Sequence, residues 1–157
     1  MRAGQSIQVT MPKPMPHCEF EEKNLLLRLD MTLLGSVEKI DPVVESVMKI
    51  VREMGCAAGK EDDVALSLQE ALANAIRHGC KNDPRKTVQC VVACDEDRGM
   101  LIIVRDPGEG FDPSQIPSPL VGQNVFSTHG RGIYLINQLM DEVHFERGGT
   151  EIYMRKR

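Results

Sequence analysis

The chain has 157 residues, 41% of them hydrophobic and 27% charged, and its formal net charge is −4. This length suits a single domain that buries roughly two thirds of the surface of its unfolded chain. The negative net charge argues against a protein that binds nucleic acids or membrane surfaces in general. The basic residues 155–157 can be explained as a solvent-exposed segment that binds no partner.

Five cysteines are present, and no two of them form a C-x-x-C pair. With this odd number, no signal segment and no long apolar run, we expect reduced thiols in a cytoplasmic protein. Cys90 and Cys94 fall in a strand-like run without a histidine pair at ligand spacing, so we expect no zinc site.

The first half of the chain predicts an arm, a strand and two helices. Three alternating prolines make residues 1–18 an extended or flexible arm, and we expect a single domain over residues 19–157. The run "LLLRLDM" predicts a strand. Asp41-Pro42 predicts the N-cap and first turn of a helix that ends at Gly55, and a second helix is expected from about residue 61 to 79.

The second half predicts two hairpins separated by a long connection. "TVQCVVAC" and "MLIIVRD" read as strands joined by residues 95–99, and the chain ends in a hairpin that turns at Gly148-Gly149. Residues 111–129 contain three prolines and no periodicity, which is typical of a lid over a site. A short helix is expected after this lid, through residues 133–140.

Glu70 and Asn74 lie one helical turn apart, in "QEALANAIRHG", and therefore project from the same helix face. Such a pair can share a ligand or a metal ion, or can be a hydrogen-bonded structural pair. Their face is turned away from the apolar stripe of this helix, which favours the wall of a pocket.

Two glycine-containing motifs follow along the chain. In "RDPGEGF", Asp106 ends an apolar strand, and Gly108 and Gly110 allow the backbone to approach a ligand, although an Asp turn at a strand end is also common without one. In residues 127–133, "STHGRGI", glycines at the start of a helix leave N–H groups open to a phosphate. The alternative is a helix junction that binds nothing.

In this order and spacing, the three motifs resemble those of the GHKL or Bergerat-fold ATP-binding superfamily. Glu70-x-x-x-Asn74 is similar to its N box, Asp106-x-Gly108-x-Gly110 to its first glycine box, and Gly130-x-Gly132 to its second. The stretches "EALANAIRHG", "RDPGEGFDP" and "GRGIYLINQLMDEV" resemble the small bacterial anti-sigma factor serine kinases, and this similarity covers about residues 20–157.

The resemblance implies a role for each matching residue. Asn74 would coordinate the Mg²⁺ of bound ATP, and Glu70 would be the general base. Asp106 would accept a hydrogen bond from the adenine amine, partly through a water shared with Thr150. Gly108 and Gly110 would let the chain pass the nucleotide.

The remaining candidates surround the phosphates. Gly130, Arg131 and Gly132 would hold the phosphate groups, and Thr128 belongs to the same stretch. His78, behind Asn74, would contact the nucleotide or cap the end of its helix.

The resemblance also implies an α+β fold, a two-layer sandwich with a mixed, mainly antiparallel sheet, helices on one face and an ATP lid. It implies a serine/threonine kinase that uses Mg-ATP to phosphorylate a STAS-type anti-anti-sigma partner, sequesters a sigma factor and forms a homodimer. Two alternatives remain open: a nucleotide-responsive interaction module without efficient transfer, and a stand-alone histidine-kinase-type catalytic domain.

Overall fold

The computed structural model of the chain describes residues 24–111 and 128–157, and for residues 128–130 it describes the backbone alone. The expected arm at residues 1–18, and residues 112–127 of the expected lid, lie outside these ranges. Within them, none of the helices combines the length and hydropathy that crossing a membrane requires.

Five strands form one sheet in the order β1-β2-β3-β5-β4. Their bounds are Leu25–Leu34 (β1), Thr87–Asp95 (β2), Gly99–Arg105 (β3), Glu142–Glu146 (β4) and Glu151–Lys156 (β5). All four neighbouring pairs in this described sheet are antiparallel. Both predicted hairpins are confirmed, β2–β3 around residues 95–99 and β4–β5 around the glycines at 148 and 149.

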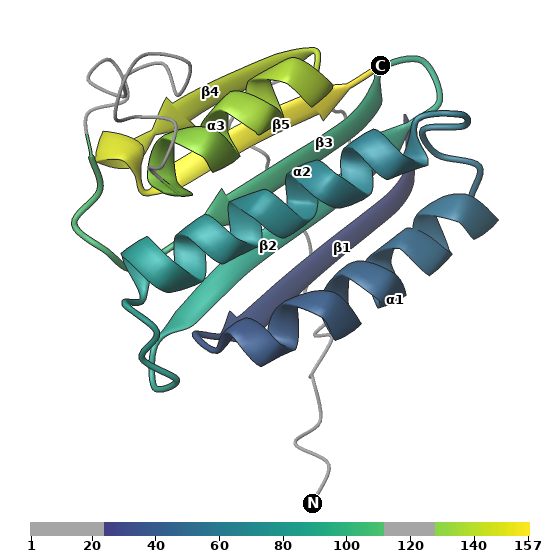
Figure 1. The fold of residues 1–157 in the computed structure, drawn as a ribbon. Coiled ribbons are helices and arrows are strands. Elements are labelled where there is room, and N and C mark those ends of the chain that lie inside the picture. Colours follow the sequence, from purple (N-terminus) through teal and green to yellow (C-terminus); the bar gives the residue numbers. More distant parts are fainter. Residues whose placement is uncertain (1–23, 112–127) are drawn as a thin grey trace, which may run out of the picture.

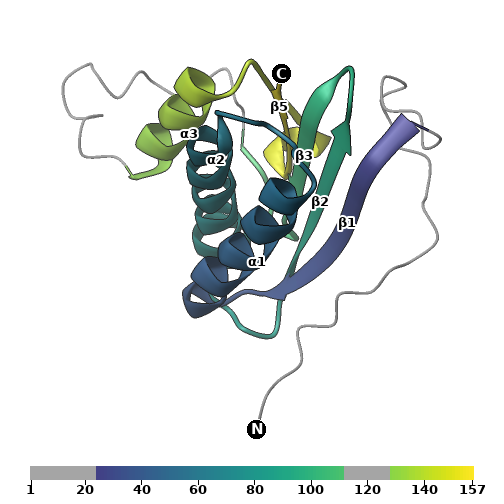
Figure 2. The same cartoon turned by 90° about the vertical axis from the view of Figure 1, so that its right-hand side faces the viewer.

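Three helices cover one face of the sheet, which confirms the two-layer α+β fold (Figures 1 and 2). They are α1 (Ile40–Glu53), α2 (Glu61–Asn74) and α3 (Thr128–Leu139). Helix α2 is central and packs against both α1 and α3. The side of α2 that faces α3 is therefore covered by another element.

The helix ends differ from the predictions. A 3₁₀ turn, Val37–Lys39, leads into α1, so Asp41 lies in the first turn of the helix and does not cap it. At the other end, the expected continuation of α2 is a π-helix, Ala75–Gly79, in which the N–H of Cys80 donates to the carbonyl of Ala75 at 2.9 Å. Such wide turns often occur at functional sites.

The core lies between the helices and the sheet. Residues from all these elements interdigitate there and are fully shielded from solvent: Val51, Val64, Leu68, Leu72, Ile76, Val88, Met100, Ile102, Ile136 and Met154. Burying a side chain of this size contributes about 1.5–3 kcal/mol. This core fixes α2 against β3, two of the elements that contribute residues to the site.

The prediction of reduced thiols is wrong for one pair of cysteines. Cys56, between α1 and α2, forms a disulfide with Cys94 of β2, and their Cα atoms are 6.2 Å apart. The two residues are 38 positions apart in the chain, and only the fold brings them together. Cys80 and Cys90 are buried free thiols, and burial raises the pKa of Cys90 to about 12.

Candidate functional site

The face of α2 that carries Glu70 and Asn74 lies directly against the start of α3. A Cβ atom placed on Gly132 would be 2.9 Å from Oε2 of Glu70 and 3.0 Å from Nδ2 of Asn74. A side chain at position 132 would push the ends of the Glu70 and Asn74 side chains away, so glycine lets all three residues keep these positions. The first and third motifs, about 60 residues apart in the chain, therefore meet in space.

Asp106 follows β3 and faces the end of the π-helix. A Cβ atom on Gly79 would overlap the carboxyl group of Asp106, at 2.2 Å from its Cγ, so this contact also requires glycine. The N–H of Gly108 donates to Oδ1 of Asp106 at 2.8 Å. The loop after β3 thus holds the carboxylate while the helix backbone lies against it.

The 3₁₀ turn Arg147–Gly149 closes the site on the side of β5. The N–H of Asp106 donates to the carbonyl of Thr150, and the N–H of Phe111 donates to that of Gly148, at 2.9 and 2.8 Å. The hydroxyl of Thr150 donates to the carbonyl of Arg147 at 2.9 Å. Backbone bonds therefore join the turn to the segment that carries the second motif.

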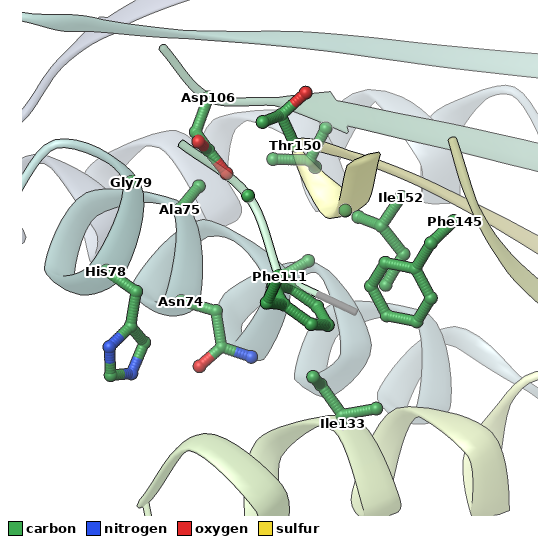
Figure 3. A pocket seen from close by; sticks show the side chains of 14 residues that line it. Asn74, Ala75, His78, Gly79, Asp106, Phe111, Ile133, Phe145, Thr150 and Ile152 are labelled. Atoms are coloured by element: carbon green, nitrogen blue, oxygen red, sulfur yellow. The ribbon is translucent and has the colours of Figure 1, made fainter. Parts of the chain in front are cut away.

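A pocket of about 70 Å³ lies between these segments (Figure 3). Its wall combines a few polar groups with apolar side chains: Ala71, Asn74, Ala75, His78, Gly79, Val104, Asp106, Gly110, Phe111, Ile133, Phe145, Gly149, Thr150 and Ile152. The Phe111 and Phe145 rings pack edge to face with centroids 5.2 Å apart, and Phe111 lies between Asn74 and Phe145 in Figure 3. This mixture is typical of a small-molecule site.

Most of the predicted site residues surround this pocket. Asn74, His78, Asp106, Gly110 and Thr150 line it directly. Gly108 adjoins it through its bond to Asp106, and Gly132 through its closeness to Asn74, with Glu70 also beside Gly132.

The residues expected around the phosphates are described only in part by the structure. Arg131 is exposed and does not line the pocket, and the side chains at 128–130, including Thr128 and Gly130, lie outside the described residues. Helix α3 begins at Thr128, so Gly130 and Gly132 belong to its first turns and not to a loop before it. A phosphate at this end would meet N–H groups of the helix itself.

Several lining residues were not predicted. Gly79 carried a signal, since a glycine that ends an apolar helix directly after the Glu70/Asn74 pair can mark a close backbone contact. Phe145 and Ile133 carried none, because their apolar side chains fit the ordinary core pattern of a strand and a helix. Their contribution follows from packing that only the fold determines.

Asp106 is a polar group of the pocket with a shifted pKa. Burial raises the pKa of its carboxyl group, and the hydrogen bond from the Gly108 backbone opposes this shift only in part. No side-chain cation contributes to the shift. The carboxylate therefore retains acceptor capacity directed at the pocket, which is a common property of functional residues.

The model of the histidine kinase-like ATPase domain family matches residues 34–156. The chain belongs to this family. The resemblance to GHKL proteins is thereby confirmed.

The relatives of this histidine kinase-like ATPase domain include serine-protein kinases named RsbW. The protein of that name from Bacillus subtilis (strain 168) is 29% identical over 143 residues, which is 85% of this chain and 88% of the relative. Its namesake from Bacillus licheniformis is 32% identical over 114 residues, 68% of this chain and 71% of the relative. The Staphylococcus epidermidis protein is 27% identical over 137 residues, 82% and 85% of the two chains.

The residues of the pocket fit an adenine nucleotide in their chemistry. Asp106 provides a half-buried acceptor for an amine, and at Gly132 the backbone lies close to Glu70 and Asn74. The described residues contain no group of three or more His, Cys, Asp or Glu side chains that could hold a metal ion. This fits Mg²⁺, which is usually bound by one or two protein oxygens together with phosphates and water.

The pocket must widen to hold a nucleotide. Pockets for ligands of this size measure roughly 300–1,000 Å³, well above the cavity of about 70 Å³ in this structure. Phe111 and Ile133 occupy the space between α2, β5 and α3. Movement of either side chain would enlarge the cavity.

Proposed function

We propose that this ATPase-family domain is a serine/threonine kinase that binds Mg-ATP, phosphorylates a STAS-type anti-anti-sigma partner and, in its other partner state, sequesters a sigma factor. The convergence of three separate motifs carries the proposal: Asn74 and Asp106 line one pocket, and Gly132 lies against Asn74 beside it. The names of the relatives, serine-protein kinases, support the same activity.

In this proposal, each motif performs one part of the reaction. Bound Mg-ATP supplies the phosphoryl group and neutralises charge that develops during transfer. Asn74 offers its amide oxygen to the ion, and Glu70, one helical turn earlier, accepts the proton of the attacking hydroxyl. Asp106 accepts a hydrogen bond from the adenine amine, with Thr150 beside it.

The remaining residues position the nucleotide. Gly108 and Gly110 bring the backbone close to its base, and the N–H groups at the start of α3, from Thr128 to Gly132, bind the phosphates with Arg131 nearby. His78 contacts the nucleotide at the rim of the pocket. We also propose a cytoplasmic homodimer that associates through β1 and α1.

The proposal is tested with labelled ATP and candidate STAS proteins. Wild-type protein should label its partner, and Glu70→Ala should lower the transfer rate about 10²- to 10⁴-fold while ATP affinity is retained. Asp62→Ala removes an exposed carboxylate from the same helix and should change neither quantity. Unchanged transfer in Glu70→Ala would remove Glu70 as the base.

Two other outcomes would support one of the two alternative functions and not the serine/threonine kinase. Tight, nucleotide-dependent partner binding without label indicates an interaction module. Labelling of a histidine on a separate helical protein indicates a histidine-kinase-type catalytic domain working in trans.

A further inference from the structure

A buried carboxylate, Glu151, lies directly behind the pocket but does not line it. Its side chain is 1% exposed. Its neighbour Ile152 points into the helix-covered core, so alternation along β5 places Glu151 on the opposite face of the sheet. A buried carboxylate is costly unless it is paired, which makes its partners informative.

Among the described residues, three side chains donate to Glu151 or form an ion pair with it. The Nε–H of Arg105 and the hydroxyl of Tyr153 both donate to its carboxylate. Nε of Arg147 lies 3.6 Å from its Oε2. Glu151 is thus held by one residue from β3, one from β5 and one from the 3₁₀ turn Arg147–Gly149.

Each of these segments also carries part of the pocket. Arg105 immediately precedes Asp106, and Glu151 immediately follows Thr150. Arg105 and Glu151 are also the last register pair of the β3–β5 ladder, beyond which the bond from the Asp106 N–H to the Thr150 carbonyl continues the pairing. The hydrogen bonds at the end of a strand pair open most easily. At this end, the contacts of Glu151 with Arg105 and Arg147, which we call the clamp, therefore hold the backbone that positions Asp106.

We propose that Glu151 is a positioning residue for nucleotide recognition, which holds Arg105 and Arg147 behind the sheet and thereby fixes Asp106 and Thr150 on the pocket side. This inference rests on the proposed function. Burial alone would raise the pKa of Glu151, but the hydrogen bonds from Tyr153 and Arg105 and the charges of both arginines outweigh it and lower the pKa. The clamp therefore remains ionised at neutral pH.

The opposite end of β5, where it pairs with β4, provides a control. Glu142 of β4 pairs there with Arg157 and Arg155, at 2.5 and 3.7 Å, and is 43% exposed. Just beyond that end, the N–H of Asp141 donates to the carbonyl of Arg155 at 2.9 Å, the same length as the bond made by Asp106. If the loss of any ion pair at an end of β5 weakened ATP binding, variants at both ends of the strand would show it.

The test compares three variants of the full chain: Glu151→Gln, Tyr153→Phe and Glu142→Gln. Glu151→Gln should weaken ATP binding about tenfold and reduce the preference for ATP over GTP, since a misplaced acceptor loses much of its effect. Tyr153→Phe should have a smaller effect of the same kind, and Glu142→Gln should change neither quantity. Hydrogen exchange of the Asp106 amide should accelerate in the first two variants and that of the Asp141 amide only in the third.

The inference is overturned if Glu151→Gln keeps its ATP affinity and selectivity while only its unfolding midpoint falls, because Glu151 then acts on stability alone. If Glu151→Gln does not fold, Tyr153→Phe decides by the same measurements. If the wild-type chain binds no nucleotide, the proposed function fails. Exchange of the Asp106 amide then decides the positioning role, and an unchanged rate in both variants overturns it.

Discussion

Asp106 and Glu151 are two carboxylates, half-buried and buried respectively, at the same end of the β3–β5 strand pair, on opposite faces of the sheet. Their pKa values shift in opposite directions. Burial raises the pKa of Asp106, and only the backbone N–H of Gly108 opposes the shift. Burial also acts against ionisation of Glu151, but Tyr153 and two arginines outweigh it and lower the pKa.

The two carboxylates differ in the partners that offset burial. Glu151 is compensated from within the chain, so its charge contributes to the folded state. Asp106 is compensated only in part, so the folded protein keeps an acceptor that is incompletely satisfied and faces a pocket. Groups held in this way reduce stability and are characteristic of functional sites.

The largest effect is expected for Asp106→Asn. An amide at this position presents a donor where the adenine amine needs an acceptor, and a lost hydrogen bond to a charged group costs about 1.5–3 kcal/mol. ATP affinity should therefore fall roughly 10- to 100-fold and the preference for ATP over GTP should be lost. Isothermal titration with both nucleotides measures these changes.

The same substitution should not lower the unfolding midpoint, because it removes the charge that burial disfavours. Glu109→Gln, an exposed carboxylate in the same loop, is the matched control and should leave both affinity and stability unchanged. If Asp106→Asn were clearly less stable than the wild-type chain, Asp106 would be a compensated group like Glu151 and the comparison would fail.

Stability should respond in the opposite sense to Glu151→Gln. The substitution leaves Arg105 without its carboxylate and weakens the bond from Tyr153, so the free energy of unfolding should fall by about 1–3 kcal/mol. Arg105 is 36% exposed, and water that reaches it keeps the loss below that of a fully buried pair. Urea unfolding measures the change, and a loss no larger than that of Glu142→Gln would contradict it.

The two carboxylates should also differ in their pH dependence. The pKa of Glu151 is lowered from 4.5, so its contribution to stability is present above that value and is lost as the pH falls through the folded-state pKa. The pKa of Asp106 is raised from 3.8, so its ionised form destabilises the fold at neutral pH, and this penalty is relieved as the pH falls through the raised value.

Unfolding curves recorded between about pH 3 and pH 7 separate these effects. The stability gap between the wild-type chain and Glu151→Gln should narrow in acid. Any advantage of Asp106→Asn over the wild-type chain should also disappear there, because both carry a neutral group at position 106. A gap that stays constant with pH for either variant would mean that its carboxyl group does not titrate differently on folding.

The sequence predicted the elements well because local patterns decide them. Apolar residues at helical spacing place α2, and residues 148–149 at the turn place the final hairpin. What could not be predicted depends on contacts between distant segments. The disulfide between Cys56 and Cys94 and the π-helix at Ala75–Gly79 both belong to this class.

The same division holds for the site. Glu70, Asn74 and Asp106 were found because polar residues in apolar runs are conspicuous and the motifs occur in a recognisable order. Glu151 was not found, because a Glu near the end of a chain resembles any solvated residue until β3 places Arg105 opposite it. A local sequence pattern cannot show which side chains a neighbouring strand places beside a residue.

The smallest effect is expected for Arg147→Ala, and it sharpens the account of how Glu151 is compensated. Arg147 is 62% exposed and lies 3.6 Å from Glu151, so solvent screens its attraction, and we expect a loss of at most about 0.5 kcal/mol in the free energy of unfolding. Arg105→Ala should cost distinctly more, since its Nε–H bonds the carboxylate directly. Equal losses from the two variants would mean that Glu151 responds to the summed charge around it and not to the Arg105 bond, which would leave β3 without the clamp that positions Asp106.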